Sequence, residues 1–292
     1  MEAALSDRLK VLSQYLLPKQ ALTAFGGLVA SARGGDYTTR LIRWFVGKYK
    51  VNMAEAANPD IASYATFNEF FTRPLKPGAR PLARADLICP VDGAISQFGR
   101  IELDQIFQAK GHRYSTTALV GGDAALGAQF DDGLFACLYL SPRDYHRIHM
   151  PCDGVLQRMI YVPGDLFSVN PVTARGVPGL FARNERVVCV FDSPRGPFVL
   201  VLVGATVVGS MATVWHGVVN PPRGGAVREW RYGDQGAKAV QLKQGEEMGR
   251  FLLGSTVVMR FPRPGEAASL VFNGAWAPGR AVCLGEAMAG TV

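Results

Sequence analysis

Apolar residues near the amino terminus recur at the spacing of an α-helix. Four leucines, each three or four residues from the next, form one stripe that ends shortly before Pro18: Leu5, Leu9, Leu12 and Leu16. Residues at this spacing lie on one face of a helix, and a proline cannot continue the helix. We therefore predict an amphipathic helix that ends near Pro18.

A second stripe predicts another helix over residues 37–50. Its apolar side consists of Leu41, Phe45 and Tyr49 with Trp44 beside them, whereas Arg40, Arg43 and Lys50 lie on other faces. Basic amphipathic helices with aromatic residues suit an anionic bilayer surface, because apolar burial and charge attraction act together. The alternative is a helical cap whose charges are merely solvated. The candidate membrane-facing residues are Leu41, Trp44, Phe45, Arg40 and Arg43.

Charge strengthens the membrane interpretation. The 292-residue chain has 31 basic and 24 acidic residues, and residues 1–51 alone hold eight basic and three acidic ones.

Five scattered cysteines argue against a disulfide framework and for a reducing compartment. The charged amino-terminal segment does not resemble a secretory leader. We expect no nucleic-acid partner.

Two apolar stretches require comparison with a membrane span. Residues 21–32 are too short, and residues 198–219, although free of charged side chains, are rich in valine and threonine and contain three glycines. Consecutive buried strands joined by turns explain the longer stretch better. We predict no transmembrane segment.

Beyond about residue 80 the pattern changes to short apolar runs separated by glycine, proline and aspartate. Such runs, rich in valine, leucine and aromatic residues, predict β-strands with turns between them. The predicted strands are 134–140, 155–161, 186–191, 198–203, 206–208, 254–261 and 270–272. The fold class is therefore α+β. A helical membrane-associating region (1–56) and a connecting segment (57–80) precede a β-rich, mainly antiparallel catalytic domain (81–292).

Two of the four histidines lie three residues apart, and a cysteine follows at the same spacing. His146, His149 and Cys152 could supply ligands for a metal ion. However, Pro151 interrupts any helix that would place all three on one face, and no second cysteine pair completes the set. We therefore predict no metal site. In an extended segment, side chains three residues apart project to opposite sides, so the two histidines are expected to have different partners.

A serine, a histidine and an aspartate together are the parts of a nucleophile, its base and an orienting carboxylate. Ser255 follows Gly254 before a β-branched run, and Asp92 lies in a predicted turn. No G-x-S-x-G elbow surrounds Ser255. Spacing alone leaves open whether these residues are catalytic or belong to an ordinary turn and strand start.

Several longer segments resemble the phosphatidylserine decarboxylase family. In chain order they are residues 67–75, 90–93, 145–151, 163–170, 181–186, 203–206, 249–251 and 253–256. The last segment, Leu-Gly-Ser-Thr, is similar to the self-cleavage motif of that family. Residues 1–50 and those after about 272 carry no such motif.

The resemblance implies a proenzyme that cuts its own chain between Gly254 and Ser255 and keeps a pyruvoyl group, derived from Ser255, as its cofactor. By analogy Ser255 is the nucleophile, His149 is its base and Asp92 orients that base. The pyruvoyl group would form a Schiff base with phosphatidylserine and accept the electron pair left by departing CO2, which gives phosphatidylethanolamine. The resemblance assigns His146 to this decarboxylation step. Cleavage would leave chains of 254 and 38 residues.

The resemblance also implies partners and a location. They are phosphatidylserine, an anionic membrane surface, association of the large and small chains, a homodimer, and peripheral attachment to the cytoplasmic side of a bacterial cell membrane. Two alternative functions remain open. One is a Ser-His-Asp hydrolase that acts on lipid or ester substrates without pyruvoyl formation. The other is a non-enzymatic membrane-binding scaffold.

Overall fold

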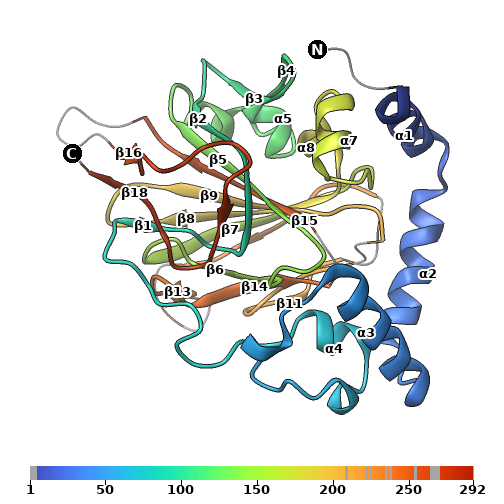
Figure 1. Ribbon diagram of the computed structural model, residues 1–292. Coiled ribbons are helices and arrows are strands. Elements are labelled where there is room, and N and C mark those ends of the chain that lie inside the picture. The colour runs from blue at the N-terminus through green and yellow to red at the C-terminus, as the bar shows by residue number, and fades with distance from the viewer. Residues whose placement is uncertain are drawn as a thin grey trace.

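A computed structural model describes residues 5–207, 210–220, 223, 225–233, 236, 239–252, 255–263 and 270–291. Helices at the amino-terminal end precede a β-rich remainder, which confirms the predicted α+β class (Figure 1). The helices are α1 (Leu5–Leu16), α2 (Lys19–Ser31), α3 (Asp36–Tyr49), α4 (Phe67–Phe71), α5 (Thr116–Leu119), α6 (Ala124–Ala128), α7 (Pro171–Gly176) and α8 (Leu180–Arg183), with 3-10 turns at Met53–Glu55 and Ile61–Ser63. The strands are β1 (Leu87–Ile88), β2 (Gly93–Arg100), β3 (Gln105–Ala109), β4 (His112–Ser115), β5 (Leu134–Leu140), β6 (Arg147–His149), β7 (Gly154–Val162), β8 (Arg186–Asp192), β9 (Phe198–Val203), β10 (Met211–Thr213), β11 (Gly217–Val218), β12 (Arg228–Arg231), β13 (Gln241–Leu242), β14 (Glu247–Phe251), β15 (Ser255–Phe261), β16 (Leu270–Phe272), β17 (Ala281–Val282) and β18 (Ala287–Thr291).

A large antiparallel sheet forms the centre of the β-rich part. Its strand order is β12-β7-β8-β9-β15-β5-β2-β17, and β13 also pairs with β7. Neighbouring strands of this sheet run antiparallel, as the sequence predicted. A four-stranded sheet (β11-β10-β14-β6), a three-stranded sheet (β1-β18-β16) and the β3-β4 hairpin complete the described strands. Strand β15 therefore lies between two full-length neighbours.

Both faces of the large sheet are buried, each against a different layer. Successive side chains of a strand point to opposite faces, so the residues of β9 enter two cores alternately. One core is closed by the four-stranded sheet, through Ile148, Met211, Met248 and Phe251. The other is covered by the short helices α5–α8, through Leu119, Leu126, Ala174, Leu180 and Phe181. Burial on both faces explains why these strands read as continuous apolar runs.

Helices α1–α3 follow one side of the molecule, and α4 lies against α3 (Figure 1). The ring of Phe45 on α3 is 5.0 Å from that of Phe67 and 5.9 Å from that of Phe70, measured between centroids. Phe45 is buried, so its assignment to the membrane-facing surface is wrong. Leu41 is half-buried against the same cluster, and its assignment stays a prediction. Periodicity locates an apolar stripe but does not identify what covers it, and here α4 covers it. Trp44, Arg40 and Arg43 are exposed.

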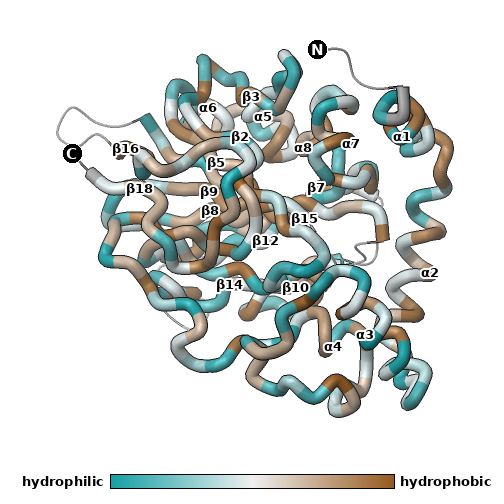
Figure 2. Tube along the Cα trace, in the orientation of Figure 1, coloured by the Kyte–Doolittle hydropathy of each residue, from teal (hydrophilic) through white to brown (hydrophobic). Residues whose placement is uncertain are grey.

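The outer surfaces of α1 and α2 expose large apolar side chains, and hydrophobic segments recur along both helices in Figure 2. The exposed residues are Leu9, Leu12, Tyr15 and Leu16 on α1, Leu17 between the helices, and Leu22, Phe25 and Leu28 on α2. Exposing such a surface to water is unfavourable, and an apolar surface of this extent on a small protein commonly marks an interaction site. Within the described part of the chain, no helix has the length and apolarity needed to cross a membrane.

One predicted strand, over residues 206–208, is wrong. Thr206 and Val207 form a turn, and Val208 lies outside the described residues. The backbone N–H of Val207 donates a hydrogen bond to the hydroxyl of Thr23 on α2 at 3.0 Å, and the Thr206 hydroxyl donates to the carbonyl of Leu166. Hydrogen bonds to Thr23 of α2 and to Leu166 therefore take the place of a strand partner, although the residue types favour a strand.

Candidate active site

Ser255 begins β15, and its Cα is paired with that of Leu140 on β5. Its side chain is completely buried, and Oγ has no hydrogen-bond partner among the described residues. Because an unpaired buried hydroxyl costs about 1–3 kcal/mol, packing alone does not account for a serine at this position. Gly254, the other half of the predicted cleavage site, and Leu253 lie outside the described residues.

A cavity of about 290 Å³, which we call the Ser255 cavity, opens beside this serine. Its walls come from α3, the end of α4, the end of β5 and the segments 168–170 and 205–207. The lining residues are Phe45, Tyr49, Phe71, Tyr139, Leu140, Pro142, Ser168, Val169, Asn170, Ala205, Thr206, Val207 and Ser255. Mostly apolar walls with a few polar groups are typical of a pocket for an organic substrate.

His146 lies just before β6 and is completely buried. Its Nδ1 is 2.8 Å from the carbonyl oxygen of Asp144, so Nδ1 carries the hydrogen and donates it. The lone pair is then on Nε2, which has no partner among the described residues. The imidazole ring packs 4.1 Å from the ring of Phe71, a wall of the Ser255 cavity. Burial, reinforced by the positive charge of Arg73, lowers the pKa of His146 to about 3. The ring is therefore a neutral base at neutral pH.

The buried neutral state of His146 predicts a pH dependence of stability. Its pKa falls from the ordinary 6.5 in the unfolded chain to about 3 in the folded one, so the unfolded chain binds the proton more readily. The contribution to the unfolding free energy is complete above pH 6.5 and is lost as the pH falls from 6.5 toward 3. We expect a loss of about 1.4 kcal/mol per pH unit from this residue.

Urea denaturation of a single uncleaved chain measures this loss. In a Ser255→Ala background, the unfolding free energy should fall more steeply below pH 6.5 with His146 present than in the His146→Gln variant. Equal slopes in the two chains would show that His146 does not titrate as its burial requires.

His149 lies on β6 and has different partners from His146, as expected for an extended segment. Its Nδ1 donates to the carbonyl oxygen of Gly245 at 2.8 Å. Its Nε2 is 3.1 Å from the hydroxyl of Tyr145 and accepts that hydrogen. Burial is the main cause that lowers the pKa of His149, so this imidazole is also neutral.

Asp92 lies immediately before β2, in a second cavity of about 240 Å³ that Arg73, Arg143 and Tyr145 also line. Its Oδ1 accepts from Nε of Arg80 at 2.9 Å and its Oδ2 from the terminal nitrogen of Arg80 at 2.6 Å. Oδ1 also accepts from the backbone N–H of Leu284 at 2.9 Å. Asp92 therefore connects chain segments from both sides of the predicted cleavage point.

The four predicted residues fall into two groups. Ser255 lines its cavity, and His146 contacts the Phe71 wall of that cavity; His149 is bonded to Tyr145, which lines the Asp92 cavity. No hydrogen bond joins Ser255, His149 and Asp92 to one another, although all three belong to the described residues. Their roles remain predictions.

Two partners in this site escaped prediction. Arg80 holds Asp92, and the hydroxyl of Tyr145 is bonded to His149. Tyr145 stands four residues before His149 in one of the resembling segments, whereas Arg80 stands in the connecting segment, where nothing in the pattern marks it. Among the residues that the structure describes, no group of three histidine, cysteine, aspartate or glutamate side chains is arranged to hold a metal ion.

Most of the chain matches a known protein family. A family model described as phosphatidylserine decarboxylase matches residues 67–290. The chain belongs to the phosphatidylserine decarboxylase family. A second family model, described as PSD, matches residues 9–50, which contain most of α1–α3. The members of the family are carboxy-lyases, and the chain is an enzyme of this class.

Curated relatives are similar in sequence to this chain over nearly its whole length. The chain is 79% identical to the phosphatidylserine decarboxylase proenzyme of Albidiferax ferrireducens, over 97% of each chain. It is 76% identical to that of Polaromonas naphthalenivorans, over 98% of this chain and 97% of the relative. Its identity to that of Dechloromonas aromatica is 71%, over 97% and 98%. Family membership favours decarboxylation over the hydrolase and scaffold interpretations.

Proposed function

We propose that this decarboxylase is a proenzyme that converts phosphatidylserine to phosphatidylethanolamine and CO2 with a pyruvoyl group made from Ser255. The observation that carries the proposal is the completely buried Oγ of Ser255, which has no hydrogen-bond partner among the described residues and lies at the edge of a cavity. A pyruvoyl group fits this position, because it would occupy the first residue of β15 and face the same cavity. When present, this group supplies a carbonyl that condenses with the substrate amine and takes up the electrons released with CO2.

Self-cleavage uses the chain's own atoms and one water molecule. Oγ of Ser255 attacks the carbonyl carbon of Gly254, the peptide bond breaks, and an ester links the two residues. Elimination then breaks the bond between Cβ and Oγ, which releases Gly254 as a carboxylate and leaves dehydroalanine at position 255. Addition of water and loss of ammonia convert that residue to pyruvoyl. The serine hydroxyl is a weak nucleophile at neutral pH, so the first step needs a base.

We assign His149 as that base, with Asp92 as the orienting carboxylate and His146 as the residue that serves decarboxylation. His146 suits its role because a neutral Nε2 beside the cavity can bind or transfer a proton at the substrate. His149 suits its role because the Gly245 carbonyl fixes the hydrogen on Nδ1 and leaves the Nε2 lone pair as the basic atom. Attack by Ser255 requires this lone pair to be released from the hydroxyl of Tyr145.

The two chains would remain associated after cleavage. Strand β15 starts the 38-residue chain and pairs on both sides with strands of the larger chain, β5 and β9. Strands β17 and β18 pair with β2 and β1. The bond from the N–H of Leu284 to Asp92 adds a further link. The homodimer stays a prediction, for which the molecular mass in solution is the measurement.

The purified protein on vesicles tests the reaction. It should release CO2 from phosphatidylserine, and phenylhydrazine, which captures carbonyl groups, should abolish this release. Full activity after exhaustive treatment with phenylhydrazine would contradict the pyruvoyl assignment. A hydrolase would instead release fatty acid or a head group.

We further propose that α1 and α2 attach the enzyme to an anionic membrane on the cytoplasmic side of a bacterial cell. The exposed apolar residues of both helices support this location, and so does the basic charge of residues 1–51. The Ser255 cavity is lined in part by α3 and by Val207, which is bonded to α2. A lipid substrate would thus reach the cavity beside the attached helices.

Replacing two exposed residues of α2 should weaken attachment. Phe25 and Leu28 are 67% and 72% exposed, so the variant Phe25→Ser, Leu28→Ser should fold normally while losing apolar area for the bilayer. We expect about tenfold weaker partitioning onto vesicles that contain phosphatidylglycerol, measured by sedimentation. Leu103, 74% exposed in the loop between β2 and β3, provides the control. If Leu103→Ser weakened binding as much, α2 would not be the attachment surface.

A further inference from the structure

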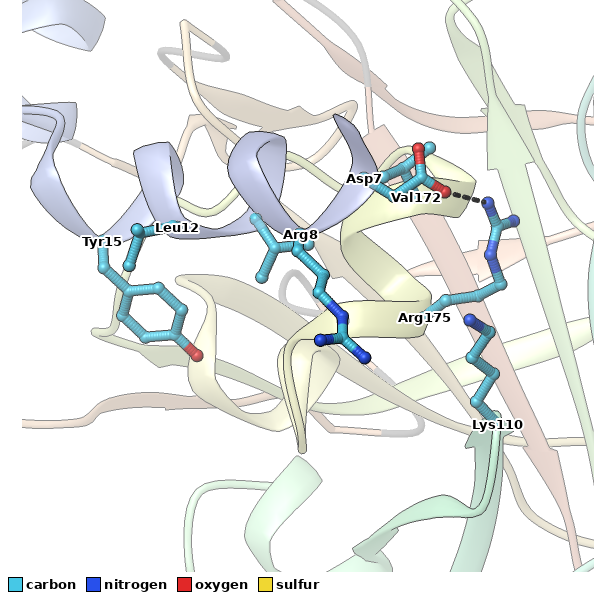
Figure 3. A pocket seen from close by; sticks show the side chains of 9 residues that line it. Asp7, Arg8, Leu12, Tyr15, Lys110, Val172 and Arg175 are labelled. Carbon is cyan, nitrogen blue, oxygen red and sulfur yellow. Dashed lines mark ion pairs between the residues drawn. The ribbon is translucent and has the colours of Figure 1, made fainter. Parts of the chain in front are cut away.

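A pocket separate from the Ser255 cavity lies between α1, α7 and the turn after β3 (Figure 3). Its volume is about 270 Å³, and it shares no lining residue with the Ser255 cavity. Helix α1 packs closely against α7 here, because a Cβ added to Gly176 of α7 would lie 2.3 Å from the side chain of Val11 on α1. The amide of Gln14 accepts a hydrogen bond from the backbone N–H of Ser168 at 3.0 Å, which also fixes α1 in place. The pocket is therefore a defined part of the fold.

Three cations converge on this pocket against one carboxylate. Arg175 is paired with Asp7 at 3.5 Å, whereas Arg8 and Lys110 have no ion-pair partner among the residues that the structure describes. Figure 3 shows Arg8 extending from α1 toward α7, and Lys110 reaching toward Arg175 from the turn after β3. The lining thus has an excess of two positive charges without a protein counterion. An arginine and a lysine so placed suit a phosphate group, the first as a planar fork of donors and the second as a point charge.

The rest of the lining is apolar and continues onto the exposed face of α1. Val11, Leu12 and Val172 lie beside the cations, and Leu12 also belongs to the exposed apolar surface. Leu9 and Leu16 are exposed on the same helix. A ligand that contacted both the cationic and the apolar part of the lining would carry a phosphate next to hydrocarbon. Free phosphate would leave the apolar part unused.

We infer that this pocket binds the phosphodiester of an anionic phospholipid that is not the substrate, with its acyl chains along the apolar face of α1. Arg8 and Lys110 contact the phosphate, and Asp7 holds Arg175 beside them. This site rests on the proposed attachment of α1 and α2 to the membrane, which it deepens by giving the anionic lipid a specific position. Diffuse attraction between basic helices and the bilayer would require no such pocket.

Calorimetric titration of the processed enzyme with dihexanoyl phosphatidylglycerol, below its micelle concentration, tests the site. The variant Arg8→Gln, Lys110→Gln should bind this lipid at least about tenfold more weakly than the unaltered enzyme. The matched control Lys76→Gln, Arg100→Gln removes the same charge from exposed positions outside residues 1–51 and should bind within about twofold. Inorganic phosphate should bind at least about tenfold more weakly than the lipid.

Each contrary result overturns one defined part of the proposal: the pocket, the lipid as its ligand, or membrane attachment. Equal weakening in both double variants, or none in the first, refutes the pocket. Equal binding of inorganic phosphate refutes the lipid and leaves a phosphate site. Sedimentation with vesicles of phosphatidylcholine and phosphatidylglycerol separates the site from membrane attachment. Retained vesicle binding without binding of the soluble lipid refutes the pocket alone, whereas the reverse refutes membrane attachment alone.

Discussion

Replacing Ser255 with alanine is expected to leave one uncleaved chain of 292 residues without decarboxylase activity. The methyl group of alanine occupies the space of the hydroxymethyl group, so the fold should persist, but no oxygen remains to attack the preceding carbonyl. Oγ has no hydrogen-bond partner among the described residues, so its removal breaks no hydrogen bond there. Denaturing electrophoresis and a CO2-release assay measure the two losses.

Thr256 provides the matched control. Its hydroxyl is also buried and unpaired among the described residues, but it projects to the opposite face of β15. The variant Thr256→Val keeps the shape of the side chain and should still cleave into two chains. Cleavage of the Ser255→Ala variant, or loss of cleavage in both variants, would contradict the assignment of Ser255 as the nucleophile.

The variants of His146 and His149 should separate cleavage from decarboxylation. The His146→Ala variant should cleave and then decarboxylate about 100- to 10,000-fold more slowly, because the unpaired Nε2 near the cavity no longer serves the substrate. The His149→Ala variant should remain uncleaved, because Ser255 loses its base. Electrophoresis reports cleavage, and single-turnover CO2 release from cleaved protein reports decarboxylation.

The exposed His216 gives a control, since His216→Ala should change neither process. If His146→Ala blocked cleavage while His149→Ala cleaved, the two roles would be reversed. The structure makes this comparison informative. Nε2 of His146 has no partner among the described residues, and its ring contacts a wall of the Ser255 cavity, whereas Nε2 of His149 is bonded to Tyr145.

Strands of the central sheet were the most predictable part of the fold. The expected strands at 134–140 and 198–203 coincide with β5 and β9. Both are buried on two faces, so their sequences are uninterrupted apolar runs between turn residues. The helices α5–α8 have four to six residues each, too few for a helical period to stand out. Their burial against the sheet supplies the stability that short helices lack alone.

The chemistry-bearing residues of the site were predicted, but their partners were not. Motifs place Ser255, His146, His149 and Asp92 in the family pattern, whereas the bond between Asp92 and Leu284 spans 192 positions. A pairing over that distance depends on the packing of β17 and β18 against β2 and β1. The apolar stripe of α3 shows the same limit, because residue spacing does not tell whether another helix or a membrane covers it.

Intact mass spectrometry of the purified protein tests the central claim most directly. We expect two species, a chain of 254 residues and one of 38 residues whose mass is lower than that of the free peptide 255–292 by one ammonia. That deficit identifies a terminal pyruvoyl group rather than serine. A decarboxylase that is active as one intact chain, or whose small chain begins with an unmodified serine, would contradict the account.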